Sequence, residues 1–217
     1  KDMIVNMLYV RSSLERANES RREMEAVNVK LLKQSETDQM TGLANRYRLN
    51  AYSEKVLDYC YEHRLPLAME ILDIDFFKQY NDNYGHQQGD ECIIAIANEL
   101  KKMEDGQTFC ARYGGDEFII IYAGISAEEV HAKAGALRQN IMNLKLEHLY
   151  SKALPIVTIS QGISYGVPEE GNRSWDFLHT ADMLLYQVKK RSRNDICIAD
   201  IRGQELDLSS KQEKVEP

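Results

Sequence analysis

The sequence of 217 residues has only four prolines, four cysteines and one tryptophan, and no long apolar run. No stretch reaches the ~18 apolar residues that a membrane span needs, and we expect no signal peptide within these residues. The four cysteines, Cys60, Cys92, Cys110 and Cys197, form no CxxC pair, so zinc-ligand spacing is absent. A chain of this length does not need disulfides, and we expect reduced, buried thiols in a cytoplasmic domain.

An excess of basic residues is also missing. The net charge is −7, which argues against nonspecific nucleic-acid binding. An acidic protein that handles a polyanion must therefore gather its few positive groups, or metal ions, in one place. Length and a hydrophobic content of 43% fit one globular domain plus an extension. The chain begins with Lys1 inside a helix-forming stretch, so we expect a fragment, the cytoplasmic part of a longer sensor or membrane protein.

Residues 1–37 are predicted to form a signalling helix, because 1–36 contain no Pro or Gly and are rich in helix formers. Every heptad d position is apolar, and the matching a positions carry two polar interruptions. The d positions are Met3, Val10, Ala17, Met24 and Leu31, and the a positions are Met7, Leu14, Arg21 and Asn28. We favour a coiled coil that forms a homodimer over a single amphipathic helix packed on its own domain.

Residues 38–200 are predicted to form the main domain, and 201–217 a polar, frayed C-terminal tail. Helices are expected near 46–63, 76–82, 90–103, 127–144 and 175–191, with Trp175 facing inward and Asn83 to Asp90 forming a turn. Strands are expected at 67–72, 108–111, 118–122, 156–164 and 196–198. This order indicates an α+β fold, a ferredoxin-like split βαβ antiparallel sheet with helices packed around it. The split βαβ centre keeps its helices on one side.

Residues 112–118 (RYGGDEF) look like a hairpin with two acidic residues at its tip. Gly114 and Gly115 are expected as a two-residue loop, because tight primed turns need positive φ. Asp116 and Glu117 follow at once, with side chains on opposite faces of the strand. The heptapeptide alone does not decide between a phosphate and metal site and an ordinary solvated hairpin tip.

A second acidic pair, Asp73 and Asp75, ends the strand at 67–72, which looks buried. If this strand neighbours the hairpin, Asp73 and Asp116 can face each other at about 5 Å. Two carboxylates that close repel each other unless a cation lies between them. Hard oxygen ligands select Mg²⁺ or Mn²⁺, which also bridge substrate phosphates. The alternative is a pair of solvated residues at a strand end.

Three cations are candidates for binding phosphate near these acidic residues. Lys78 follows a helix start at Phe76 and Phe77, whose free backbone N–H groups can bind an anion. Lys189 and Arg193 share a face at the end of the last helix. They can clamp a phosphate, or they can simply complement the helix dipole.

Asn81 and Asp90 flank the glycines at 85 and 89. A carboxylate accepts the N–H groups that guanine presents at N1 and N2 and adenine does not, and an Asn both donates and accepts. The pair can therefore read a guanine edge. The alternative is an N-cap role for Asp90 and a turn role for Asn81.

The chain resembles the GGDEF domain, the catalytic domain of diguanylate cyclases, from about residue 38 to 194. Four motifs occur in the order typical of that family: residues 38–46 (DQMTGLANR); 73–78 (DIDFFK) with Asn81 and Asp82; Gly85-His86 with Gly89-Asp90; and 112–118 (RYGGDEF). The signature motif is intact. The resemblance implies condensation of two GTP molecules into cyclic di-GMP with release of pyrophosphate, each domain binding one GTP and two domains meeting face to face.

The resemblance also implies residue roles. Asp73, the carbonyl of Ile74 and Asp116 match the metal ligands, for Mg²⁺ or Mn²⁺, and Asn81 and Asp90 match the guanine readers. The backbone of Phe76 and Phe77 and the side chains of Lys78, Lys189 and Arg193 match the phosphate contacts, and Gly114 and Gly115 leave room for the phosphates. Glu117 matches the position that assists removal of the 3′-hydroxyl proton, and Lys78 offsets charge on the phosphates.

Two departures from the family pattern stand out. The inhibitory Arg-x-x-Asp site that binds product in many members is absent, because Asp105 and Thr108 occupy its positions. Ser192 replaces the usual Gly before Arg193 and Asn194. The alternative to an active cyclase is a catalytically weak GTP-binding, dimerising module. A purine pocket that also accepts ATP is a third reading, and Asp90 argues against it.

Overall fold

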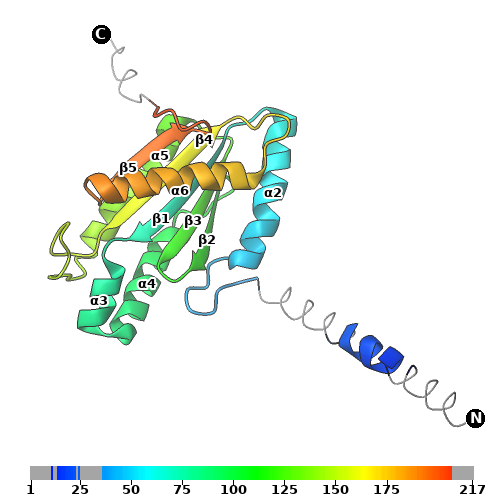
Figure 1. Ribbon diagram of the computed structural model, residues 1–217. Helices are drawn as coiled ribbons and strands as arrows, with labels where there is room; N and C mark the ends of the chain where they lie inside the picture. The colour runs from blue at the N-terminus through cyan, green and yellow to red at the C-terminus, as the bar shows by residue number, and fades with distance from the viewer. Residues whose placement is uncertain (1–10, 12–13, 23, 25–35, 207–217) are drawn as a thin grey trace, which may run out of the picture. The chain divides into compact units, whose positions relative to one another are not determined.

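The computed structural model describes residues 11, 14–22, 24 and 36–206 (Figure 1). The chain divides into two units, 1–36 and 37–217. In the first unit residues 11, 14–22 and 24 are helical, and Leu14 and Met24 are exposed. The other positions of the predicted coiled-coil seam, apart from Ala17 and Arg21, lie outside the described residues, so the coiled coil stays a prediction. Within the part of the chain that is described, no helix is long and apolar enough to cross a membrane.

The second unit is built on one five-stranded sheet with the strand order β2-β3-β1-β4-β5. The four strands of the split βαβ arrangement pair antiparallel as predicted, and β5 adds a parallel pair beside β4. The strands are β1 (Leu67–Ile74), β2 (Thr108–Gly114), β3 (Glu117–Ala123), β4 (Ile159–Gly166) and β5 (Ile196–Asp200).

Helices cover both faces of this sheet (Figure 1). The helices are α2 (Arg46–His63), α3 (Phe77–Tyr84), α4 (His86–Lys101), α5 (Ala127–Asn143) and α6 (Ser174–Arg191). α4 and α5, which belong to the split βαβ centre, pack on one face, and α2 and α6 cover the other. Side chains alternate along a strand, so β1 serves two cores: Ala68 and Leu72 pack with α4 and α5, and Leu67 and Met69 pack with α2.

Several sequence predictions hold, and three are wrong. The four cysteines are free and buried as expected, and α5 lies where the sequence predicts it, opened by a capping box of Ser126 and Glu129. The turn expected at 83–90 is mostly helical, because α4 already begins at His86. Trp175 is 62% exposed rather than inward, since it lies on the outer side of α6. The tail does not fray at once, because Leu206 donates its backbone N–H to the carbonyl of Ile198.

Gly162 in β4 sets how closely α6 approaches the sheet. A Cβ atom at this position would lie 2.2 Å from the carbonyl oxygen of Ala181 and 2.3 Å from the amide nitrogen of Leu185. Both atoms belong to the backbone of α6, so they cannot move aside like the end of a side chain. The missing side chain therefore allows α6, and the cations at its C-terminal end, to lie close against the strands.

Candidate functional site

The acidic residues of the two motifs meet where β1 ends beside the β2–β3 hairpin. Asp73 pairs with Glu117 across the ladder, so the predicted direct pairing of Asp73 with Asp116 is wrong by one residue. Gly114 pairs with Glu117, which leaves Gly115 and Asp116 as the hairpin loop instead of the two glycines. Asp116 still lies close enough to Asp73 to raise the pKa of that carboxyl group.

Asp73 is the most strongly perturbed of these acids. Its side chain is nearly buried, and burial is the main cause that raises its pKa to about 6. The Lys189 ammonium, 2.7 Å from Oδ2, opposes this shift, and the negative charges of Asp116 and Glu117 reinforce it. Burial also raises the pKa of Glu117. Three carboxyl groups thus crowd one place, and in this structure Lys189 is the cation in contact with Asp73.

Asp75 lies two residues beyond Asp73 and is fully buried. Its two oxygens accept hydrogen bonds from the hydroxyls of Thr158 and Ser160, at 2.8 and 2.7 Å, and from the backbone N–H of Asn194, at 2.9 Å. Arg193 Nη1 lies 3.5 Å from its Oδ1. Asp75 therefore fastens the loop after α6 to the sheet and positions Arg193. The sequence did not predict this role for Asp75. The consecutive residues Arg193 and Asn194, a cation and a polar residue after α6, were the signal that could have indicated it.

Phe76 sits between β1 and α3 with a φ of 56°, a left-handed conformation that is unusual for a bulky residue. Two contacts hold it there. The guanidinium of Arg193 stacks 4.3 Å from the centre of its ring, and His148 Nε2 lies 3.2 Å from its carbonyl oxygen. α3 begins directly afterwards without a side-chain cap, so its first N–H groups remain available to an anion.

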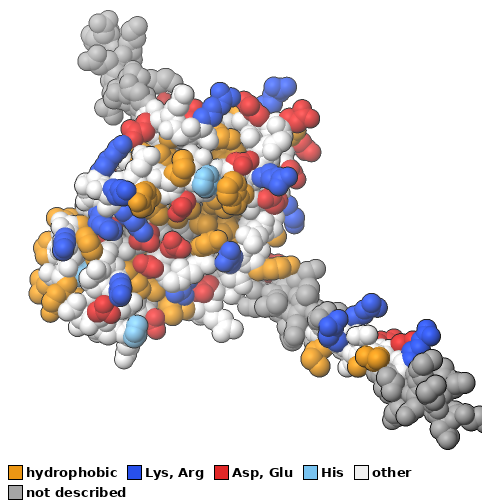
Figure 2. All heavy atoms as spheres, viewed as in Figure 1, with side chains coloured by type: hydrophobic (Ala, Val, Ile, Leu, Met, Phe, Trp, Pro, Cys, Tyr) orange, Lys and Arg blue, Asp and Glu red, His pale blue; other side chains and the backbone are white. Residues whose placement is uncertain are grey.

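A cavity of about 180 Å³ opens beside Phe76, with Lys189 and Arg193 in its wall. The two cations do not share a helix face as predicted, because α6 ends at Arg191 and Arg193 lies in the loop after it. Both still line this cavity and pair with the acids at the end of β1. Figure 2 shows basic and acidic side chains close together on the face that α6 covers. Lys78 is exposed at the start of α3 and forms no ion pair with a described residue.

Asn81 on α3 and Asp90 on α4 come from two neighbouring helices. The Oδ1 atom of Asn81 is buried and has no hydrogen-bond partner among the described residues. Gly89 lies against it, and a Cβ there would come within 1.8 Å of the same oxygen. Asp90 is exposed within α4, whose N-cap is Gly85, so the N-cap alternative for Asp90 is wrong. An unsatisfied buried acceptor is costly, which suits a site that a donor fills.

Arg112 connects the hairpin loop to the segment before α2. Its guanidinium donates to the carbonyl of Gly115, at 2.8 Å from Nη2, and forms an ion pair with Asp38 at 3.2 Å. Asp38 in turn accepts hydrogen bonds from the backbone N–H and the hydroxyl of Thr41. The motifs at residues 38–46 and 112–118 are thus in direct contact, and the first holds the second in place. Nothing crowds a Cβ at Gly114 or Gly115, so the loop is open to an approaching ligand.

No group of three or more His, Cys, Asp and Glu side chains suited to a metal occurs in the described part of the chain. Asp73 and Asp116 offer two carboxylates close enough to interact. This donor set fits Mg²⁺, which usually takes one or two protein carboxylates and completes its shell with water and substrate phosphates.

Known proteins resemble this chain in sequence. The family model described as "Diguanylate cyclase, GGDEF domain" matches residues 35–195. Probable diguanylate cyclase DgcC of Escherichia coli is 35% identical over 163 residues, which cover 74% of this chain and 42% of DgcC. Diguanylate cyclase DgcP of Pseudomonas aeruginosa is 33% identical over 190 residues, covering 86% of this chain and 28% of DgcP. The chain thus spans less than half the length of either relative.

Solved structures resemble it in fold. The coiled coil and GGDEF domain of DgcB from Caulobacter crescentus, in complex with c-di-GMP, superposes with a TM-score of 0.70 at 26% identity, covering 88% of this chain and 99% of that chain. The GGDEF domain of DgcB alone gives a TM-score of 0.68 at 28% identity, covering 76% and 93%. The motifs, the sheet and these comparisons agree: the chain belongs to the GGDEF domain family of diguanylate cyclases.

Proposed function

We propose that this chain is an active diguanylate cyclase domain that condenses two GTP molecules into cyclic di-GMP and two pyrophosphates. Each 3′-hydroxyl attacks the α-phosphate held by the partner domain. One observation carries the proposal: Asp73, Asp116 and Glu117 are gathered beside Lys189 and Arg193. The names of the relatives, diguanylate cyclases, support the reaction, and c-di-GMP in the DgcB structure supports the product.

The divalent cation, Mg²⁺ or Mn²⁺, would be held by Asp73, Asp116 and the carbonyl of Ile74. Burial raises the pKa of Asp73, and the charges of Asp116 and Glu117 raise it further. This supports the assignment, because a cation relieves the repulsion between carboxylates. When bound, such a cation lowers the pKa of an attacking hydroxyl and neutralises charge on the phosphates. Lys189, which pairs with Asp73 in this structure, is then free to turn to a phosphate.

The phosphates are proposed to bind between the hairpin loop and the start of α3. Lys189 and Arg193 supply fixed positive charge, and the backbone N–H groups at Phe76 and Phe77 supply donors at an uncapped helix start. The open loop at Gly114 and Gly115 lets a phosphate approach the backbone. The exposed side chain of Lys78 can swing in to offset charge that develops in the transition state.

The base is proposed to bind between α3 and α4, with Asn81 and Asp90 as its readers. The buried, unpartnered Oδ1 of Asn81 supports this, because a guanine N–H satisfies an acceptor that protein donors leave open. Asp90 is exposed and can accept the remaining N–H groups. Adenine lacks these donors and leaves both acceptors unsatisfied, so we expect GTP to be preferred over ATP.

Glu117 is proposed to assist removal of the 3′-hydroxyl proton. Its place directly across the ladder from Asp73 and its raised pKa support a role in proton transfer at the metal-bearing end of the sheet. The attacking hydroxyl belongs to the other GTP, so two domains must face each other. The predicted coiled coil at residues 1–37 would bring two cytoplasmic copies of the domain together.

The proposal is tested by incubating the purified protein with GTP and Mg²⁺ and measuring cyclic di-GMP across a range of protein concentrations. We expect product, and a rate that rises with the square of concentration at the low end, because two weakly associating half-sites must meet. GTP binding without cyclic di-GMP, even at high protein concentration and with an added dimerising fusion, would reject the enzyme and leave a GTP-binding module. A mixed dinucleotide in equimolar ATP and GTP would reject the guanine assignment.

A further inference from the structure

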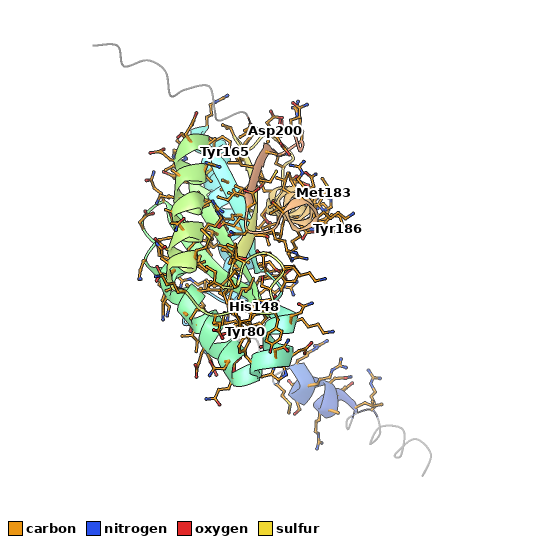
Figure 3. The ribbon with its side chains drawn as sticks, turned by 90° about the vertical axis from the view of Figure 1, so that its left-hand side faces the viewer. Tyr80, His148, Tyr165, Met183, Tyr186 and Asp200 are labelled. Atoms are coloured by element: carbon orange, nitrogen blue, oxygen red, sulfur yellow. The ribbon has the colours of Figure 1, made fainter. Side chains whose placement is uncertain are left out.

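The connection between α5 and β4, residues 144–158, reaches the start of α3. His148 is fully buried, and its ring packs edge-on against the ring of Tyr80, with 5.1 Å between the ring centres (Figure 3). The same ring donates from Nε2 to the carbonyl of Phe76. The backbone N–H of Leu149 donates to the Tyr84 hydroxyl at 3.0 Å. These contacts fix the connection against the turn that carries the proposed phosphate donors.

Directly after this anchor, Lys152 enters the wall of the 180 Å³ cavity that Phe76, Lys189 and Arg193 also line. The cavity therefore has cations on two sides: one set from the end of α6 and one lysine from the α5–β4 connection. A cavity with positive charge on two sides and Phe76 at its edge is suited to a group with several negative charges.

The cations of this cavity differ in what they already bind. Lys189 pairs with Asp73, Arg193 with Asp75, and Arg191 with Glu205 at 3.1 Å. Lys152 makes no ion pair with any residue that the structure describes. Its positive charge is therefore uncompensated within that part of the chain, and an incoming anion can bind it without breaking an existing pair.

We propose that Lys152 binds the terminal phosphates of the nucleoside triphosphate, as a further specificity residue for triphosphate over monophosphate. Lys189 lines the cavity and also contacts Asp73 at the end of β1. In the proposed function the reacting α-phosphate lies at this end of the strand. The β- and γ-phosphates then extend away from that end, into the space between the α6 cations and Lys152. The inference rests on the proposed function for the identity of the nucleotide, GTP, and not on turnover.

The test is a titration of the full chain with a GTP analogue that carries a methylene bridge between the α- and β-phosphates, in the presence of Mg²⁺. This analogue binds but cannot release pyrophosphate. Lys152→Gln should bind it about tenfold more weakly than the wild type, the effect of losing one charge-assisted contact. GMP, which lacks the terminal phosphates, should bind both proteins alike. Lys152→Arg should retain most of the affinity.

Lys145→Gln is the matched control, because Lys145 is an exposed lysine on the same connection and is absent from the cavity wall. It removes the same charge and should leave analogue binding unchanged. Equal affinities for Lys152→Gln and the wild type, or equal losses for both variants, would overturn the inference, as would wild-type protein that does not bind the analogue. Analogue binding that depends on Lys152 in a protein that makes no cyclic di-GMP would reject the proposed function and keep this inference.

Discussion

The phosphate end and the base end of the site are prepared in opposite ways. At the phosphate end Asp73 is paired with Lys189, and Asp75 with Arg193 and three further donors. At the base end Asn81 keeps a buried oxygen without a partner, and Asp90 is exposed. The first end is held in shape by the protein itself. The second leaves an acceptor open to a ligand, which is where selectivity is gained.

The largest effect is expected from Asp116→Ala, which removes a proposed metal ligand from the hairpin loop. Turnover of GTP should fall by at least about a hundredfold, because charge neutralisation at the phosphates is lost. The fold should survive, since Asp116 lies in the loop and not in a core. Asp182→Ala is the control, because Asp182 is an exposed acid that also raises the pKa of Glu117. Cyclic di-GMP production at full rate by Asp116→Ala would reject the metal assignment.

Asp75→Asn tests whether the phosphate end is held by the protein. This change keeps the shape of a fully buried side chain and removes its charge opposite Arg193, so the free energy of unfolding should fall by about 3 kcal/mol. Affinity for GTP should fall with it, because Arg193 loses its support. Urea unfolding and a GTP titration measure the two effects. A variant as stable as the wild type would show that the four contacts of Asp75 do not organise this end.

Asp90→Ser tests the base end and should behave in the opposite way. The free energy of unfolding should stay within about 0.5 kcal/mol of the wild type, because Asp90 is exposed. The preference for GTP over ATP should fall by about tenfold to a hundredfold, the effect of losing a hydrogen bond to a charged acceptor. Competition binding with both nucleotides gives the ratio. An unchanged ratio would remove Asp90 from the base site.

Glu70 on β1 offers a smaller, pH-dependent comparison with Asp75, which directly follows that strand. Both carboxyl groups are buried, but Glu70 has one donor, the Tyr122 hydroxyl at 2.8 Å, and burial raises its pKa from 4.5 to about 7. Between these two pH values the folded protein keeps a proton that the unfolded chain has released. Its stability therefore falls as the pH rises through this window.

Glu70→Gln removes that titration. The wild type should lose, relative to the variant, on the order of 2 kcal/mol of unfolding free energy between pH 4.5 and pH 7. Parallel denaturation curves at several pH values measure the difference. If the two proteins keep a constant difference across the window, Glu70 does not carry a raised pKa in the folded state.

The sequence was sufficient for elements whose signal is local. Apolar, aromatic and β-branched runs located all five strands. The 3.6-residue spacing did not place Arg193, because α6 ends at Arg191 and Arg193 lies in the loop that follows. The sequence did not predict features that depend on a one-residue difference in strand register. The bulge between Arg112 and Gly114 shifts the hairpin loop to Gly115 and Asp116, so Glu117 and not Asp116 opposes Asp73. Asp75, His148 and Lys152 depend on contacts across the sheet or between distant segments, which periodicity does not encode.

Gly162 shows how far the chemistry of such a site depends on an atom that is absent. The position has no charge, no hydrogen-bonding side chain and no contact with a proposed ligand, yet it decides how deep α6 settles and hence where its terminal cations end. A redesign could copy every polar residue of the site onto a similar sheet and place alanine at this position. It would contain the same functional groups, but the cations of α6 would lie too far from the strands. The spacing between helix and strand is therefore itself part of the recognition of phosphate.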